Sequence, residues 1–287
     1  SPQSQPRVQA MQQVTLPSGE KVAALGLGTW QMAEDRAKRA DEIATIRLAL
    51  DLGMTLLDTA EMYGEGRAEE LIAEALPGRR DQAFIVSKVY PQNATRKGAI
   101  EACERSLKRL KTDRIDLYLL HWRGNAPLAE TLEAFTALQK AGKIRHHGVS
   151  NLDREDMQEL WSLPGGKACA TDQVMYNLAR RGIEWNLLPW CREQKIPVMA
   201  YCPIERADLQ KDQKLARFAK QHGMTWAQVA LAWLLSKPDV IVIPKTSRPE
   251  RLRENHGALK FKLDATQLAE LDRLFPPPKG PGPLDMS

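Results

Sequence analysis

Four polar residues with complementary chemistry stand out along the chain: a carboxylate, a phenol, an ammonium and an imidazole. They are Asp58 and Tyr63 in DTAEMY, Lys88 in VSKVYP and His121 in LYLLHW. Asp58, Lys88 and His121 each end a short apolar run typical of a buried strand, and Tyr63 follows Asp58 by five residues. An acid, a base and a cation delivered to strand ends indicate a proton-transfer site built around a tyrosine.

A charged residue that closes a buried strand costs free energy unless it is paired. One such residue is explained by a buried salt bridge, whereas several at the same strand end favour a functional site. Taken alone, Tyr63 could be a rim aromatic and His121 a hydrogen-bonded core histidine, so only the set points to chemistry. Further polar residues end the later strands: Ser150 with Asn151, Gln173, Tyr201 and Lys245.

Short apolar runs alternate with helical patterns along the chain, and this alternation predicts repeated strand–helix units. Eight such units predict an α/β fold, the (β/α)₈ TIM barrel, whose sites form at the carboxyl ends of the strands. A doubly wound sheet is the alternative, but GLGTW at the first strand lacks the third glycine and the following helix of the dinucleotide fingerprint. The expected strands are Leu25–Thr29, Thr55–Asp58, Ala83–Lys88, Leu117–His121, His147–Ser150, Ala170–Val174, Pro197–Tyr201 and Val240–Ile243.

Other elements are expected outside this repeat. The segment Val14–Val22 predicts an N-terminal β-hairpin that could plug the bottom of the barrel. The long interval before the last strand has room for an extra helix, Asp212–His222. In the helix after it, Trp226 and Trp233 lie on one apolar stripe and are interpreted as core. Asp264 begins a capping box that opens the last helix.

The charge pattern limits the class of partner. The net charge is +5, and basic residues are spread along the chain apart from one cluster between Lys245 and Arg253. A nucleic-acid groove needs a broader basic stripe with interleaved aromatics, so the cluster better suits one phosphorylated small molecule. No apolar run approaches the roughly 20 residues of a membrane helix, and no membrane partner is expected.

The cysteines and the N-terminus indicate the compartment and the domain boundaries. The four cysteines lack metal-ligand spacing, which predicts free thiols, no metal site and a reducing cytoplasm. The first ten residues are polar and lack the apolar core of a secretory signal. Residues 1–10 are expected to be a disordered, processed or artificially added lead-in, and residues 11–287 one barrel domain.

Several of these segments, in order along the chain, resemble the signatures of the aldo-keto reductase family. They are GLGTW, DTAEMYGEG, VSKVYP, LYLLHW, GVSN, the segment around Gln173 and IPKTSRPERLREN. The match runs from Val14 to Leu274. The segments RGIEWNLLPWC and PPPKGPGPLDM are similar to the bacterial methylglyoxal-reductase, or small-aldehyde-reductase, branch.

The resemblance implies a barrel that binds NADPH and reduces a carbonyl to an alcohol. Tyr63 would donate the proton, but a free phenol has a pKa of about 10, too high to cycle easily at neutral pH. Lys88 is expected to lower the pKa of Tyr63, because a nearby ammonium stabilises phenolate. Asp58 would hold Lys88 in place, and His121 would orient the carbonyl oxygen by a hydrogen bond.

The resemblance also implies the cofactor contacts. Tyr201 matches the tyrosine that stacks on nicotinamide, with a barrel-core aromatic as the alternative interpretation. Thr246 and Cys202 stand where the family often has serine. The expected cofactor residues are Ser150, Asn151 and Gln173 for the carboxamide, Cys202 and Ile204 beside Tyr201, Lys245, Thr246 and Arg251 for the adenosine 2′-phosphate, and Glu254 and Asn255 for adenine.

The substrate is expected to be a small carbonyl compound. Trp30 and Trp122 match positions that line the substrate pocket, and the loop after His121 is short. An open, tryptophan-lined pocket suits a small aldehyde or an α-dicarbonyl such as methylglyoxal. The alternatives are a nicotinamide-binding sensor or regulatory subunit with slow turnover, and a barrel isomerase that binds a phosphosugar at the basic cluster. A monomer is the default expectation.

Overall fold

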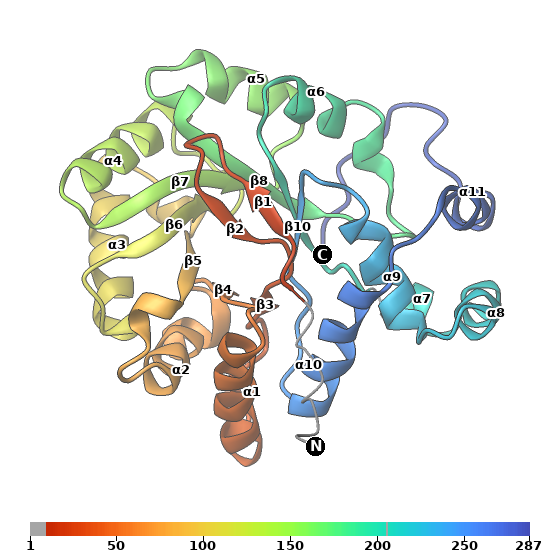
Figure 1. Cartoon of the computed structure of the whole chain (residues 1–287). Helices are drawn as coiled ribbons and strands as arrows, with labels where there is room; N and C mark the ends of the chain where they lie inside the picture. The colour runs from red at the N-terminus through yellow and green to blue at the C-terminus, as the bar shows by residue number, and fades with distance from the viewer. Residues whose placement is uncertain (1–9, 205) are drawn as a thin grey trace.

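The computed structural model describes residues 10–204 and 206–287. Eight parallel strands form one sheet in chain order, and bridges from Leu25 to Val242 and from Gly28 to Lys245 join its two edges. The sheet therefore closes into the expected barrel, and all eight expected strands are confirmed (Figure 1). The strands are β3 Leu27–Gly28, β4 Leu56–Asp58, β5 Phe84–Val89, β6 Ile115–Leu120, β7 Ile144–Ser150, β8 Cys169–Met175, β9 Val198–Tyr201 and β10 Val240–Val242.

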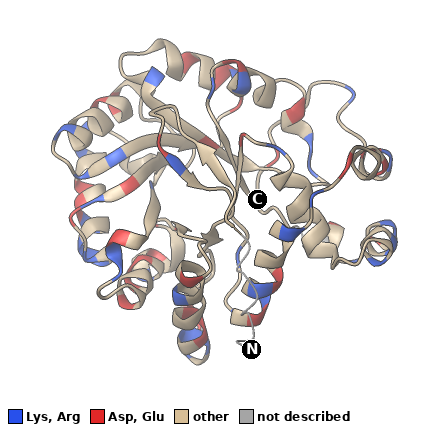
Figure 2. Cartoon of the chain, viewed as in Figure 1, with Lys and Arg blue, Asp and Glu red and all other residues tan. Residues whose placement is uncertain are grey.

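The predicted lead-in lies almost wholly outside the described residues, since only Ala10 of that segment is described. Figure 2 shows charges of both signs interspersed over the outer helices, whereas most of the strand surface carries none. Within the described part of the chain, no helix is long and apolar enough to cross a membrane.

Helices surround the sheet and connect its successive strands (Figure 1). Their first turns show the expected capping chemistry. Thr225 and Gln228 form a capping box at the start of α9, and Asp264 and Gln267 form the predicted one at α11. The predicted extra helix is present as α8, with a short α7 before it. The helices are α1 Arg39–Asp51, α2 Arg67–Ala75, α3 Arg96–Leu110, α4 Leu128–Lys140, α5 Arg154–Ser162, α6 Leu187–Glu193, α7 Arg206–Leu209, α8 Gln213–Gln221, α9 Trp226–Leu235, α10 Pro249–His256 and α11 Ala265–Leu274.

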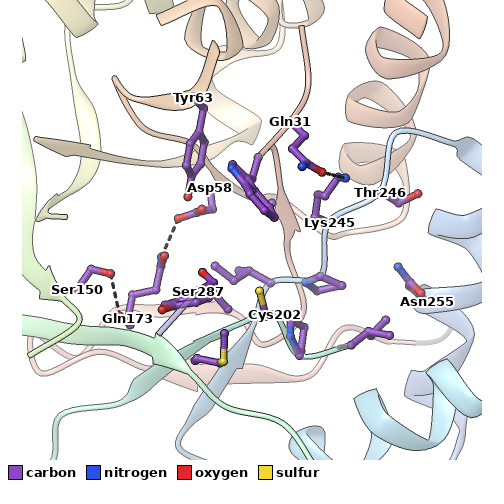
Figure 3. Close-up of a pocket in the computed structure, with 18 of the residues that line it drawn as sticks. Gln31, Asp58, Tyr63, Ser150, Gln173, Cys202, Lys245, Thr246, Asn255 and Ser287 are labelled. Atoms are coloured by element: carbon purple, nitrogen blue, oxygen red, sulfur yellow. Dashed lines mark hydrogen bonds between the residues drawn. The ribbon is translucent and has the colours of Figure 1, made fainter. Parts of the chain in front are cut away.

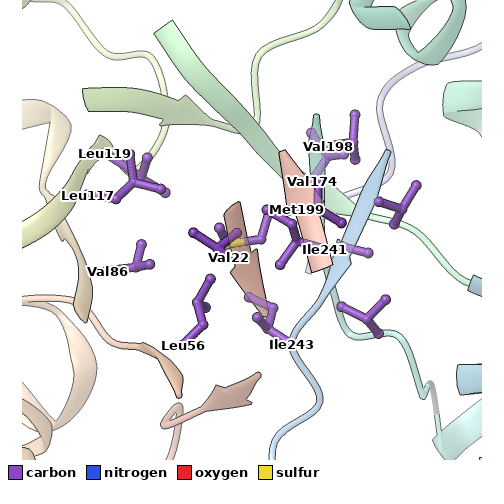
Figure 4. Close-up of a cluster of buried hydrophobic side chains, with 14 of the residues drawn as sticks. Val22, Leu56, Val86, Leu117, Leu119, Val174, Val198, Met199, Ile241 and Ile243 are labelled. Atoms are coloured by element: carbon purple, nitrogen blue, oxygen red, sulfur yellow. The ribbon is translucent and has the colours of Figure 1, made fainter. Parts of the chain in front are cut away.

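The predicted hairpin is formed by the antiparallel strands β1 Gln13–Thr15 and β2 Lys21–Ala23. Val22 lies among buried side chains of the barrel strands, including Leu56 and Ile241 (Figure 4). Glu20 at the hairpin tip accepts a hydrogen bond from Arg145, near the amino end of β7. The hairpin therefore closes the amino-terminal end of the barrel, which leaves the opposite end open for a site.

Candidate active site

A cavity of about 590 Å³ opens at the carboxyl ends of the strands. Every residue that the sequence predicted for the site lines this cavity except Lys88, which is fully buried beneath it. The structure thus brings together residues that are nearly 230 positions apart, because parallel strands of a barrel all end at the same rim. The predicted residues that line it are Trp30, Asp58, Tyr63, His121, Trp122, Ser150, Asn151, Gln173, Tyr201, Cys202, Ile204, Lys245, Thr246, Arg251, Glu254 and Asn255.

Lys88 lies behind the cavity wall and is held by a dense set of acceptors. Its Nζ lies 2.9 Å from both carboxylate oxygens of Asp58, 2.9 Å from the carbonyl oxygen of Thr59 and 3.2 Å from the hydroxyl of Tyr63. Burial lowers the pKa of Lys88, and the Asp58 carboxylate opposes that shift. The ion pair supplies the compensation that a buried ammonium needs.

Tyr63 begins a 3₁₀ turn, Tyr63–Gly66, directly after the loop that follows β4. Burial raises the pKa of Tyr63 well above its usual value, and the negative charge of Asp58 adds to the rise. Burial therefore outweighs the lowering of this pKa that is expected from the adjacent Lys88 ammonium. The phenol keeps its proton at neutral pH.

His121 follows β6 and is only 8% exposed. Burial, together with the positive charge of Lys88, lowers the pKa of His121 to about 3, so the ring is neutral. The ring packs edge-on against Tyr63, with centroids 5.9 Å apart, and its Nδ1 has no hydrogen-bond partner among the described residues. A neutral imidazole at this place can orient a carbonyl oxygen through a hydrogen bond without carrying charge.

Asn151 connects three strand ends on the other side of the cavity. Its backbone N–H donates to the carbonyl oxygen of Gln173 at 2.9 Å, and its side-chain amide donates to the carbonyl oxygen of His121 at 3.1 Å. Its Oδ1 accepts a 2.7 Å hydrogen bond from the hydroxyl of Tyr201. Ser150 also donates to the Gln173 carbonyl at 2.8 Å. Hydrogen bonds thus connect the amide of Asn151 with the ring of Tyr201 and the end of β6.

Lys245 lies on the side of the cavity away from Ser150 and Gln173 (Figure 3). Lys245 follows β10 and donates to the side chain of Gln31 at 2.9 Å. Thr246 is buried just before α10, and Arg251 lies in that helix, 3.9 Å from Glu254. Cations beside a helix N-terminus form a favourable place for a phosphate group.

Some lining residues were not predicted from the sequence. Trp233 is buried as predicted, and Trp226 is partly buried and packs against the core but also lines the cavity. Helical periodicity shows which side of α9 is apolar but not that its first turn reaches the rim. Nothing in the sequence signals that the C-terminal tail returns to the cavity. The other unpredicted lining residues include Gln31, Met62, Met175, Met286 and Ser287.

The fold and the site together define a class of protein. The model of the aldo/keto reductase family matches residues 24–275, and the chain therefore belongs to the aldo-keto reductase family. Methylglyoxal reductase YeaE of Escherichia coli (strain K12) is 50% identical over 268 residues, which cover 92% of this chain and 94% of that protein. Glyoxal reductase of Bacillus subtilis (strain 168) is 30% identical and covers 95% of this chain and 96% of its own length.

Solved structures agree with this membership. An aldo-keto reductase from Klebsiella pneumoniae in complex with NADPH is similar to the chain with a TM-score of 0.94 and 48% identity. The similarity covers 97% of this chain and 100% of that chain. A structure of an aldo/keto reductase from Klebsiella pneumoniae in complex with NADP and acetate has a TM-score of 0.93, with the same identity and coverage.

Proposed function

We propose that the protein is an NADPH-dependent reductase that converts small aldehydes or α-dicarbonyls, such as methylglyoxal, to alcohols. The observation that carries this proposal is the 3.2 Å contact between Lys88 Nζ and the Tyr63 hydroxyl, beside a neutral His121. The names of the methylglyoxal and glyoxal reductases to which the chain is similar support the substrate class, and the NADPH complex of the Klebsiella relative supports the cofactor.

The residues present fit NADPH. Tyr201 offers a ring beside the amides of Asn151 and Gln173, which suits the nicotinamide and its carboxamide. Lys245 and Arg251 offer cations at the far side, which suit a phosphate group on the adenosine. The buried residues Thr246 and Asn255, together with Glu254, would contact the adenosine, and Cys202 and Ile204 would flank the nicotinamide half.

The bound cofactor would supply a hydride to the carbonyl carbon. Because burial raises its pKa, Tyr63 holds its proton at neutral pH. The proton is then available for transfer to the developing alkoxide, which is a much stronger base. Once the proton has left, the phenolate lies 3.2 Å from the Lys88 ammonium, which stabilises it. Asp58 keeps Lys88 in place, and His121 aims the carbonyl oxygen at Tyr63 by a hydrogen bond.

The entrance to the cavity favours small substrates. Trp30 is 43% exposed and lines the cavity with Trp122 and Met286. Trp122 packs edge-on against His121, with ring centroids 4.9 Å apart. An apolar side chain therefore lies next to His121, the residue proposed to orient the substrate carbonyl. A volume of about 590 Å³ must also admit part of the cofactor, which leaves room for a substrate of few atoms.

A substrate panel with purified protein tests the function. We expect NADPH oxidation with methylglyoxal, glyoxal and small aldehydes, and much slower oxidation with steroid-sized ketones. Rapid reduction of bulky ketones with no turnover of methylglyoxal would contradict the substrate class. Tight NADPH binding without turnover of any carbonyl would favour a nicotinamide sensor, and absence of NADPH binding would favour a phosphosugar enzyme.

We further propose that the protein acts as a one-domain monomer in the cytoplasm. Within the described part of the chain, none of the four cysteines forms a disulfide, as expected in a reducing compartment. Light scattering coupled to gel filtration would test the monomer, and fractionation of the source cells would test the compartment.

A further inference from the structure

Asp172 is a buried carboxyl group that the chemistry above does not use. It precedes Gln173 on β8, its side chain is fully buried, and it does not line the cavity. Its Oδ1 accepts a hydrogen bond from the backbone N–H of Leu152 at 3.3 Å, while its Oδ2 has no partner among the described residues. Burial of a carboxyl group with only one hydrogen-bonded oxygen costs free energy. A role of Asp172 in the site would explain why this cost is tolerated.

The group that Asp172 holds is the turn after β7. Asn151 in this turn has a φ of 59°, in the left-handed region that side chains other than glycine adopt at a cost. Its N–H donates to the main-chain oxygen of Gln173, and the next N–H, that of Leu152, donates to the side chain of Asp172. Two successive turn residues are therefore held by two successive residues of one strand.

The alternation of side chains along the strand shows on which side of the sheet Asp172 lies. Gln173 faces the cavity, so Asp172 faces the outer helices. The turn is thus held within the sheet by the main-chain oxygen of Gln173 and from the outer side by the carboxyl group of Asp172. Asn151 belongs to this turn, and its side-chain amide forms hydrogen bonds with the His121 carbonyl oxygen and the Tyr201 hydroxyl.

We propose that Asp172 is a positioning residue for the nicotinamide end of the site, whose carboxyl fixes the turn at Leu152 and so sets where the Asn151 amide stands. This inference rests on the proposed NADPH function, because it assigns the effect to one end of that cofactor. The adenosine end is built from residues after β10, whereas the hydrogen bond of Asp172 goes to the turn after β7.

The surroundings of Asp172 define the best comparison variant. Burial raises the pKa of Asp172 well above its usual value, and the charges of Asp153 and Asp156 in and beside α5 add to the rise. Two thiols, Cys169 on β8 and Cys191 on α6, lie close enough to interact electrostatically with Asp172. Burial raises the pKa of Cys169 to about 12. Burial therefore favours the neutral form of this carboxyl group, and asparagine is the neutral counterpart of equal shape.

The test uses the full chain with Asp172→Leu and Asp172→Asn. Leucine fills the apolar site but offers no acceptor to Leu152, whereas asparagine keeps an oxygen at Oδ1. Binding of NADPH is compared with binding of adenosine 2′,5′-bisphosphate, which lacks nicotinamide. We expect Asp172→Leu to raise the dissociation constant of NADPH by about threefold to tenfold, the range for loss of one buried hydrogen bond. The dissociation constant of the bisphosphate should stay within about twofold of its wild-type value. Asp172→Asn should match the wild type for both ligands.

Several outcomes would overturn the inference. One is that Asp172→Leu weakens the binding of both ligands equally, which would show a general structural role. Others are unchanged NADPH binding in that variant, or an Asp172→Asn variant that behaves like Asp172→Leu. If the wild type binds the bisphosphate but not NADPH, the proposed function fails together with the inference. If the wild type binds NADPH normally and both variants equal it, the inference alone fails.

Discussion

The side-chain amide of Gln173 donates a 2.7 Å hydrogen bond to Oδ1 of Asp58, across 115 positions of sequence (Figure 3). The same oxygen accepts a hydrogen bond from Lys88, so one carboxylate receives both the ammonium and the amide. Gln173 belongs to the group proposed for the nicotinamide, and Lys88 to the group proposed for the proton. Asp58 thus joins the two halves of the site, and a change to Asp58 should disturb both.

Loss of the Tyr63 hydroxyl should separate binding from chemistry. We expect Tyr63→Phe to bind NADPH as the wild type does, since the ring and its packing against His121 remain. Its kcat should fall by about 10²–10⁴, the usual contribution of general acid catalysis. Fluorescence titration and steady-state assays measure the two effects, and an unchanged kcat would rule out Tyr63 as the proton donor.

Removal of Lys88 should destabilise the fold through Asp58. Lys88→Met leaves the buried Asp58 carboxylate without its cation, a change that costs about 3–5 kcal/mol in comparable buried pairs. The double variant Lys88→Met with Asp58→Asn should regain much of this stability, because no isolated charge remains, but it should not regain activity. Urea unfolding and kcat together check the expectation, which fails if the single and double variants are equally stable.

A plot of log kcat/KM for carbonyl reduction against pH should show no change of slope near the ordinary histidine pKa of 6.5. His121 is neutral above a pKa of about 3, and Tyr63 stays protonated until well above 10. Both groups are therefore in their active states between about pH 5 and 9. A pH profile of kcat/KM at saturating NADPH tests this range, and a bend near 6.5 that disappears in His121→Gln would show a charged imidazole in the reaction.

The free energy of unfolding should fall in acid because of His147, a buried histidine outside the site. Burial lowers the pKa of His147 to about 4, below its unfolded value of 6.5. The contribution of His147 is therefore fully present above pH 6.5 and is lost as the pH falls toward 4, since only the unfolded chain takes up the proton there. His147→Gln should have a shallower slope of unfolding free energy against pH over this interval than the wild type.

The preference for NADPH over NADH should depend on Lys245. We expect Lys245→Ala to raise the KM for NADPH by about tenfold to a hundredfold, as for loss of a charge-assisted hydrogen bond, and to change the KM for NADH little. Arg248→Ala is the matched control, because Arg248 is ion-paired with Glu250 and does not line the cavity. Equal effects of Lys245→Ala on both cofactors would contradict a role at the 2′-phosphate.

The sequence by itself determined the barrel and most of the residues that line the cavity. Apolar runs that end in Asp58, Lys88 and His121 marked the strands and their carboxyl ends, and a closed parallel sheet has only one place where those ends meet. The hairpin, the extra helix and the capping box at Asp264 were also predictable, because each depends on a local pattern of turn, period or cap.

Only the tertiary structure decided how the site residues influence one another. It shows that Lys88 is buried behind the cavity and paired with Asp58, and that burial of Tyr63 raises the pKa of the phenol. It also brings Trp226 and Met286 to the cavity. The physical reason is that solvation and electric field depend on every neighbour in space, whereas sequence patterns report only which residues are adjacent along an element.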